Sequence, residues 1–587
     1  MAEDFSSKIS LHPLDETVCL HGEDVENLTK FYTYPSSAER ETHVFWDVVQ
    51  YPIPPNANLK SVRSGIISAL DQMGFYGSVS INAYGGRMNH SKDDLYKAQI
   101  LHIPQGEGEM AVDLIVYAHT RSPRNFMVIP KPDPDSELHR VLKCLQTRHH
   151  NLLLVNTKPK AHKQDCPFLS DSDSVQSVVD CTQGLDGGRP IIGGIRMKDT
   201  LPVIKDLPSL EFLFHRKLNT QRQGSERKAF VFWDVVKYPI PTYANIINVG
   251  NDIRAALQRL GHHGCVEILA FGGDKLNLNH LNDDLYKEAR IICIPQGFFE
   301  TALHFFSTSL FHGPLMVIPK PDPGSDLDRV LTRLKERGYD VLSVKPPDDE
   351  DSPQDDLFLQ YAQLILGCTY GLYEGKPIIR GRRKMKDIHV IQDFSKPITF
   401  EKGATAGVFW NLEDFPFPAG AGWKPDDIYK KIESAFRADG YELSNMLIWA
   451  YVDDKEGSWG GDFLKYKTWK SSIYFLPGGG DKSARRNRML HDISLWATDL
   501  ESPYYHFPAY LVLVSDQDKV REDEEFSCTL RVLKQSDYNV LVASPTKSKW
   551  TKSKWLPSLS TYTFGNERRI RTEGGVGSSG LIHSFCY

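Results

Sequence analysis

The chain has 587 residues, of which 41% are apolar and 25% charged, and its formal net charge is −6 at pH 7. This composition is typical of folded globular domains and argues against a disordered chain. The small negative charge excludes a general electrostatic attraction to nucleic acid, so any such contact needs a local patch of basic residues.

The beginning of the chain and its cysteines indicate an intracellular protein. The opening letters "MAEDFSSKIS" lack the basic and apolar segments of a secretory leader, and no run reaches the ~18 apolar residues of a membrane span. Nine scattered cysteines, an odd number without a CxxC pair, are typical of reduced thiols. We therefore expect no membrane span and a cytoplasmic location.

One eleven-residue phrase occurs three times: "VFWDVVQYPIP" begins at Val44, "VFWDVVKYPIP" at Val231 and "VFWNLEDFPFP" at Val408. The copies lie about one domain length apart, for which ~100–200 residues is usual. We predict three tandem domains, called the first, second and third units. The expected bounds are 1–40 for an N-terminal extension, 41–160, 227–346 and 404–545 for the units, 161–226 and 347–403 for accessory segments or linkers, and 546–587 for a basic and aromatic tail.

Apolar runs and amphipathic stretches alternate through the first unit. The pattern predicts strands at 43–46, 78–85, 98–104, 126–130 and 151–156, and helices at 58–74, 110–120 and 136–148. Such alternation indicates an α/β fold with a mostly parallel sheet and helices on both faces. Functional groups in sheets of this kind lie at the carboxyl ends of the strands.

Four aspartates of the first unit are candidates for that edge. Asp47 ends the first strand, Asp113 lies on the central helix, and Asp133 and Asp135 follow the strand "FMVIP". Clustered carboxylates repel one another unless a cation neutralises them, and Mg²⁺ or Mn²⁺ is the usual solution in phosphate chemistry. The alternative is that Asp113 is a helix-surface acid and that Asp133 and Asp135 belong to a turn or a helix N-cap.

These motifs resemble the NYN domain, a branch of the PIN-like ribonucleases. The form "FWD" is especially similar to the meiosis regulator and mRNA stability factor family and to plant NYN proteins. The resemblance implies three Rossmann-like α/β/α sandwich domains, metal-dependent endoribonuclease activity and an association with peroxisomes in that subgroup. It assigns Asp47, Asp113 and Asp133 or Asp135 as ligands of Mg²⁺ or Mn²⁺, with Gln50 where the family usually has Asn; "PKPDPDS" departs from the family's "SGDxDF" turn.

The later units depart further from this pattern. In the second unit Asp234 is kept, but His304 replaces the helix acid, Lys237 replaces Gln50, and Asp322 remains from the acidic pair. In the third unit Asn411 replaces the first aspartate, whereas the other acids keep the pattern: Asp492, Asp516 and Asp518. Asn binds a divalent cation more weakly than a carboxylate. The sequence predicts a degenerate site in the second unit and a weaker site in the third, where the alternative is compensation for Asn411 by Glu413 or Asp414.

The tail carries the pattern of a single-strand binder. Lysines can neutralise phosphates and indole rings can stack on unpaired bases. The residues concerned are Lys547, Lys549, Trp550, Lys552, Lys554 and Trp555. The alternative is a solvated connection after the last strand with one or both tryptophans in the core.

Two functions from different classes follow from these observations. One is a metal-dependent endoribonuclease that processes single-stranded RNA mainly with the first unit. The other is a catalytically degenerate scaffold that binds RNA or regulatory proteins and takes part in regulating gene expression, because fold alone does not establish activity.

Overall fold

The structure is a computed structural model of the whole chain. The description covers these residues: 40–53, 57–86, 90–104, 107–119, 123–157, 174–190, 228–239, 245–272, 288–294, 313–345, 359, 361–372, 392–400, 403–416, 423–453, 469–477, 481–500, 507–515, 517–544 and 558–561.

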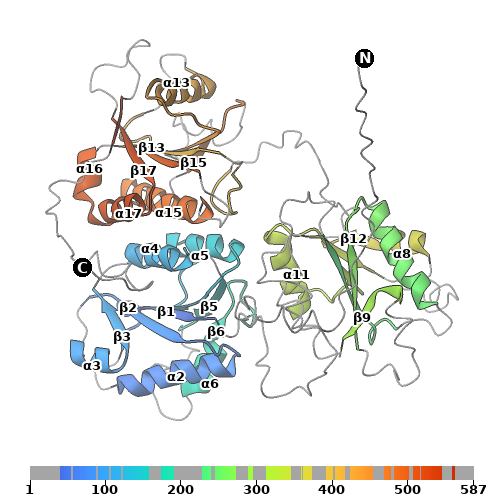
Figure 1. Cartoon of the computed structure of the whole chain (residues 1–587). Coiled ribbons are helices and arrows are strands. Elements are labelled where there is room, and N and C mark those ends of the chain that lie inside the picture. The colour runs from blue at the N-terminus through green and yellow to red at the C-terminus, as the bar shows by residue number, and fades with distance from the viewer. Residues whose placement is uncertain are drawn as a thin grey trace, which may run out of the picture.

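Three six-stranded sheets form the framework, and all three have the same strand order (Figure 1). In the first sheet the order is β3-β2-β1-β4-β5-β6, and only β6 runs antiparallel to its neighbour. The predicted fold class, three tandem α/β units with mostly parallel sheets, is therefore confirmed.

The first unit begins with a buried strand and alternates strands with helices. Its elements are β1 (Thr42–Asp47), α2 (Leu59–Gln72), β2 (Val79–Tyr84), α3 (Lys92–Lys97), β3 (Ile100–Ile103), α4 (Glu107–Ala118), β4 (Asn125–Ile129), α5 (Glu137–Thr147), β5 (Asn151–Val155), α6 (Ser174–Cys181) and β6 (Thr182–Gln183). The last two elements lie in the segment that the sequence placed between units. They complete the first sheet with a helix and an edge strand.

The second unit repeats the order of the strands. Its elements are β7 (Ala229–Asp234), α8 (Ile246–Arg259), β8 (Val266–Phe271), β9 (Ile291–Ile294), β10 (Leu315–Ile318), α11 (Asp326–Glu336), β11 (Val341–Val344), α12 (Ala362–Gly367) and β12 (Thr369–Gly371). Helices α8 and α12 cover one face of the sheet and α11 covers the other.

The third unit has the longest helix of the molecule's described part. Its elements are β13 (Thr405–Asn411), α13 (Pro425–Ala438), β14 (Asn445–Val452), β15 (Ile473–Pro477), α15 (Lys482–Leu500), β16 (Ala509–Val514), α16 (Gln517–Glu522), α17 (Glu524–Gln535), β17 (Asn539–Ser544) and β18 (Ser558–Thr561). Strand β18 pairs with β17, so part of the predicted tail belongs to the third sheet. Cys528 in α17 is disulfide-bonded, so the expectation that all cysteines are reduced is wrong there.

The side chains of each first strand divide between the two faces of its sheet. In β1, Val44 and Trp46 pack toward α2 and α6, whereas Phe45 packs toward α4 and α5. All three are fully buried, as the continuous apolar run predicts for a central parallel strand. The parity also places Asp47 on the same face as Phe45, at the carboxyl end of the strand.

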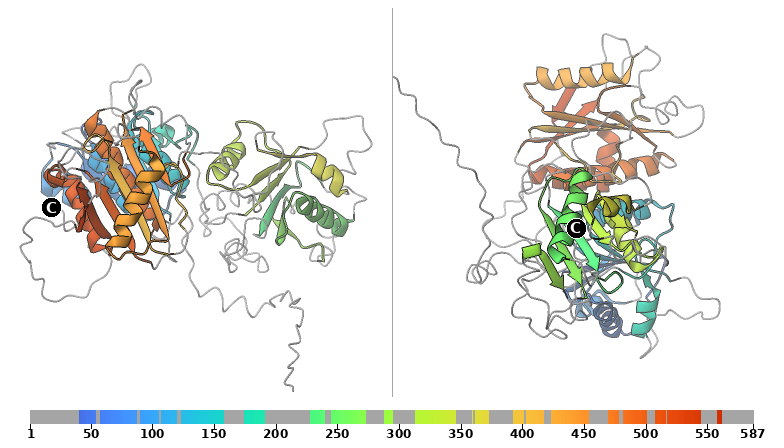
Figure 2. Two further views of the ribbon diagram at one scale, coloured as in Figure 1. Left: turned by 90° about the horizontal axis from the view of Figure 1, so that it is seen from above. Right: turned by 90° about the vertical axis from the view of Figure 1, so that its right-hand side faces the viewer.

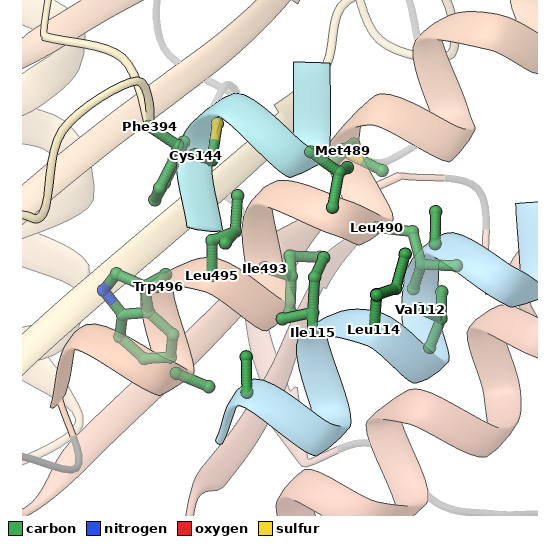
Figure 3. Close-up of a cluster of buried hydrophobic side chains, with 14 of the residues drawn as sticks. Val112, Leu114, Ile115, Cys144, Phe394, Met489, Leu490, Ile493, Leu495 and Trp496 are labelled. Atoms are coloured by element: carbon green, nitrogen blue, oxygen red, sulfur yellow. The ribbon is translucent and has the colours of Figure 1, made fainter. Parts of the chain in front are cut away.

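The first and third units share one hydrophobic core. Helix α15 packs against α4, and the buried side chains of both units form a single cluster that includes Ile115, Ile493 and Trp496 (Figure 3). The second unit stands to one side of this pair in Figure 1 and in the left view of Figure 2. No helix within the described ranges is long and apolar enough to cross a membrane.

Candidate functional site

The first-strand aspartate organises the loop that follows it. Asp47 is buried, and its Oδ1 accepts hydrogen bonds from the backbone N–H groups of Val49 at 2.8 Å and Gln50 at 3.0 Å. This is an Asx turn, in which a side-chain oxygen replaces a backbone carbonyl. Gln50 itself is exposed, at the carboxyl edge of the sheet.

The counterparts of Asp47 make the same turn in the other units. Oδ1 of Asp234 accepts from the N–H groups of Val236 and Lys237, both at 3.1 Å. Oδ1 of Asn411 accepts from the N–H of Glu413 at 3.1 Å. The change from Asp to Asn in the third unit therefore keeps the loop structure, because both residues carry the accepting oxygen.

The helix acid of the first unit is held by a tyrosine. The hydroxyl of Tyr84 donates to Oδ2 of Asp113 at 2.8 Å, and Tyr84 lies beside Asp47 in the register of β1 and β2. Burial, together with the nearby charge of Asp113, raises the pKa of Tyr84 well above its usual value, so the hydroxyl remains the donor. Asp47 and Asp113 thus lie on the same face at the carboxyl edge.

The third unit repeats this pair but adds positive charge. The hydroxyl of Tyr451 donates to Oδ2 of Asp492 at 3.0 Å. Nη2 of Arg140, from the first unit, lies 2.9 Å from Oδ1 of Asp492, and Nε of Arg488 lies 3.7 Å from Oδ2. The carboxylate of Asp492 is fully buried between these groups.

The pairing between the first and third units explains this difference. His119 and Thr498 stand six residues after Asp113 and Asp492, and their side chains meet at 3.3 Å. In symmetric dimers, contact between equivalent positions is a sign of two-fold symmetry, and the first and third units show such a contact. Helices α4 and α15 run in the same direction in Figure 3. Counted back from the helix C-caps, Cys528 is the counterpart of Arg140, so the third unit has a cysteine where the first has the arginine that reaches Asp492.

The acidic pair after β4 lies apart from these residues. Asp133 and Asp135 are exposed in the turn before α5. The carbonyl of Asp133 accepts from the N–H of Ser136 at 3.0 Å, and Ser136, not an aspartate, caps the helix. In the second unit Asp322 is also exposed and accepts from Ser325 in the same way, at 3.1 Å.

In the third unit Asp414 stands where the first has Gln50, and it is neutralised by lysines. Its Oδ1 lies 3.2 Å from Nζ of Lys519 and 3.4 Å from Nζ of Lys482. Its Oδ2 accepts from Asn411 at 3.1 Å and from Ser515 at 2.7 Å. A carboxylate that could compensate for Asn411 is therefore present, but it already has two cationic partners.

Across the described ranges, no group of three or more His, Cys, Asp or Glu side chains is placed to hold a metal ion. The four acids of the first unit thus do not form a ready Mg²⁺ or Mn²⁺ site there. Several predicted residues lie outside the described residues or have side chains that are not described: His304, Asp516, Asp518, Lys547, Lys549, Trp550, Lys552, Lys554 and Trp555.

The sequence reasoning missed the tyrosine partners of the helix acids. Tyr84 and Tyr451 occupy equivalent positions, where the second unit has Phe271. The same unit has His304 in place of the helix acid. The paired loss of hydroxyl and carboxylate was a signal within the repeats that could have identified the interaction.

The fold and this edge of the sheet define the first unit as an α/β domain with acidic side chains at the carboxyl ends of its parallel strands. Residues 41–173 match the family model of the NYN domain, a branch of the PIN-like ribonucleases. An RNA-related, ribonuclease-like function is therefore supported for this part of the chain.

Other comparisons add no functional argument. No curated protein matches the chain. A UDP-GlcNAc 2-epimerase from Neisseria meningitidis bound to UDP-GlcNAc is 10% identical and aligns over 56% of this chain and 89% of that one, with a TM-score of 0.15. A putative UDP-N-acetylglucosamine 2-epimerase from Listeria monocytogenes has the same identity and TM-score, over 56% and 86%. Likeness at this TM-score carries no argument about fold or function.

Proposed function

We propose that the chain processes or regulates RNA, and that any hydrolytic activity belongs to the first unit. The observation that carries this proposal is the placement of Asp47 and Asp113 on one face at the carboxyl edge of the first sheet, within the residues that match the NYN family model. In the third unit, Asn411 takes the place of Asp47, and Arg140 and Arg488 lie beside the helix acid Asp492. A buried carboxylate with two cationic neighbours is poorly suited to bind a further cation.

In this proposal the residues of the first unit position the acids. The Asx turn holds Asp47 at the end of β1, and Tyr84 holds Asp113 on the same face. A divalent ion would supply charge stabilisation in phosphodiester hydrolysis. The described side chains do not form a complete site for such an ion. We also propose that the chain is similar to the meiosis regulator group and that it is located in the cytoplasm.

A second candidate function is a scaffold that binds RNA or a regulatory protein without cleaving RNA. The scattered positions of Asp133 and Asp135 and the lysine-neutralised Asp414 favour it. In this function the edge of the sheet would recognise a partner, and Asp47 would serve only the loop.

The deciding experiment is cleavage of a labelled single-stranded RNA by the full chain, with Mn²⁺ and Mg²⁺ titrated and RNA binding measured on the same samples. The variants are Asp47→Asn and Asp113→Asn, and the control is Asp439→Asn, an exposed residue at the end of α13 in the third unit. We expect both site variants to lose about 100-fold in rate or more while still binding RNA, because removal of a charge that acts in the transition state costs that much.

The other outcomes separate the two functions. Equal cleavage by the wild type and all variants would show that the activity does not come from this edge. Binding without cleavage in every protein would favour the scaffold.

A further inference from the structure

The junction between the first and second units contains a row of arginines on one helix. Arg329, Arg333 and Arg337 are four residues apart along and just after α11, so their side chains share one face. That face meets the first unit at the loop 184–189 and at the C-terminal end of α5.

Among the described residues, only the outer end of this row, at the half-buried Arg329, has a close carboxylate partner. Arg329 makes a bidentate pair with Asp186 at 3.0–3.1 Å. The Arg329 guanidinium occupies the space that a side chain at position 188 would need, which Gly188 leaves open. Arg333 lies farther in, and its Nη2 is 3.9 Å from the same Asp186.

The inner end of the row is buried with less compensation. Arg333 is 5% exposed and Arg337 6% exposed. Arg337 donates from Nε to the carbonyl of Gln146 at 3.0 Å and from Nη2 to that of His150 at 3.5 Å. Within the described part of the chain, Nε of Arg333 and Nη1 of Arg337 are buried without a hydrogen-bond partner.

Such an arrangement costs free energy unless an anion completes it. The carbonyls at the end of α5 offer only the partial negative charge of a helix C-terminus. Burial and the neighbouring Arg333 lower the pKa of Arg337 to about 9, and burial with nearby Arg337 and Arg148 lowers the pKa of His150 to about 3. Burial is the main cause of both pKa shifts and the neighbouring cations add to it, and buried charges normally need a counter-ion.

We propose that this arginine row binds a compact phosphate group at the junction of the first and second units. A phosphate oxygen accepts several N–H groups at once, and the planar guanidinium forks of Arg333 and Arg337 match that geometry. The phosphate can be inorganic or the terminal phosphate of an RNA. Bound there, it joins α11 to α5 and fixes the second unit against the first.

The test is isothermal titration of the full chain with inorganic phosphate at constant ionic strength. Arg333→Met removes an unpaired N–H but leaves the bonds of Arg337 to Gln146 and His150 intact, so the junction itself is preserved. We expect phosphate affinity to fall about tenfold or more in this variant, the scale of a lost charge-assisted hydrogen bond. Arg437→Met, at an exposed ion pair on α13, is the matched control and keeps wild-type affinity.

A second arm identifies the source of the phosphate. Two RNAs of one sequence, with a 5′-phosphate or a 5′-hydroxyl, are titrated against the wild type and Arg333→Met. A preference for the 5′-phosphate that Arg333→Met abolishes assigns the site to RNA ends, whereas inorganic phosphate binding without that preference assigns it to the free ion. No phosphate binding by the wild type, or equal binding by wild type and Arg333→Met, overturns the proposal.

Discussion

At the last residue of the first strand of each unit, Asp and Asn support the same loop structure but differ in charge. Asp47 and Asn411 both use Oδ1 to accept backbone N–H groups, so the turn survives either residue. Only the carboxylate adds a negative charge to the edge. A substitution that looks like the loss of a ligand can therefore leave the fold untouched, which makes Asp47→Asn a sound variant for testing catalysis.

His150 shows how burial and neighbouring arginines control one titratable group. Its Nδ1 accepts a hydrogen bond from the backbone N–H of Arg124 at 3.1 Å, which requires an unprotonated nitrogen. Burial, with nearby Arg337, Arg148, Arg40 and Arg124, lowers its pKa to about 3. The imidazole is thus neutral in the folded chain throughout the physiological range.

We predict from this that stability falls as the pH drops below about 6.5, the ordinary pKa of histidine. The unfolded chain binds a proton there while His150 in the folded chain does not, so each pH unit costs up to ~1.4 kcal/mol until the pH approaches 3. Urea unfolding between pH 7 and 5, where carboxylates contribute little, measures the slope. This pH slope of the unfolding free energy should be smaller in His150→Gln, whose side chain can accept the same hydrogen bond. An unchanged slope would show that His150 is not the source of the pH dependence.

Among the elements, α15 is held close to its sheet by a glycine in the first strand of the third unit. A Cβ at Gly407 would lie 2.6–2.8 Å from ring atoms of Trp496, closer than van der Waals contact allows. Trp496 is fully buried in the core shared with the first unit. The small residue in β13 therefore sets how near α15 can approach.

Gly407→Ala should lower the free energy of unfolding by about 1–3 kcal/mol, because the indole must move within a packed core. Urea unfolding followed by tryptophan fluorescence measures the change. Gly86→Ala is the control, since a Cβ there meets no atom within 4 Å and the residue is exposed. Equal stability of the two variants would show that α15 is not constrained by this contact.

At the scale of the molecule, a buried ion pair joins the first and third units. Arg148 donates from Nε and Nη2 to the two carboxylate oxygens of Asp499 at 2.8 and 2.7 Å. The side chains are 5% and 4% exposed, and Arg148 also donates to the carbonyl of Phe394 at 3.1 Å. At the same helix C-cap position as Arg148, the second unit has Arg337 and the third has Ser536. Arg337 bonds to Gln146 of the first unit, so this helix position connects units in two of the three copies.

Arg148→Met should weaken the contact of the first and third units by about 3–5 kcal/mol, because Asp499 is left as an unpaired buried charge. Hydrogen exchange at the amides of α4 and α15 measures the change. The double variant with Asp499→Leu should recover part of the loss. Arg437→Met, which breaks an exposed pair, should change protection little. Equal exchange in Arg148→Met and wild type would contradict a role in pairing.

The sequence by itself determined the repeated α/β architecture. The strands of the first unit are continuous apolar runs and its helices are amphipathic. These local patterns determine which side chains of each element are buried, whatever other units pack beside it. The repeated phrase also predicted which residue ends each first strand, because alignment of the copies needs no knowledge of packing.

Only the tertiary structure decided what the acids contact. Asp113 and Asp492 look equivalent in the sequence, yet Asp492 is paired with an arginine from another unit. Arg140 and Arg148 appear in the sequence as ordinary helix cations, and nothing in their local pattern indicates that they face the third unit. Local sequence reports periodicity along one element, whereas the charge around a side chain is set by elements hundreds of residues away that the fold brings together.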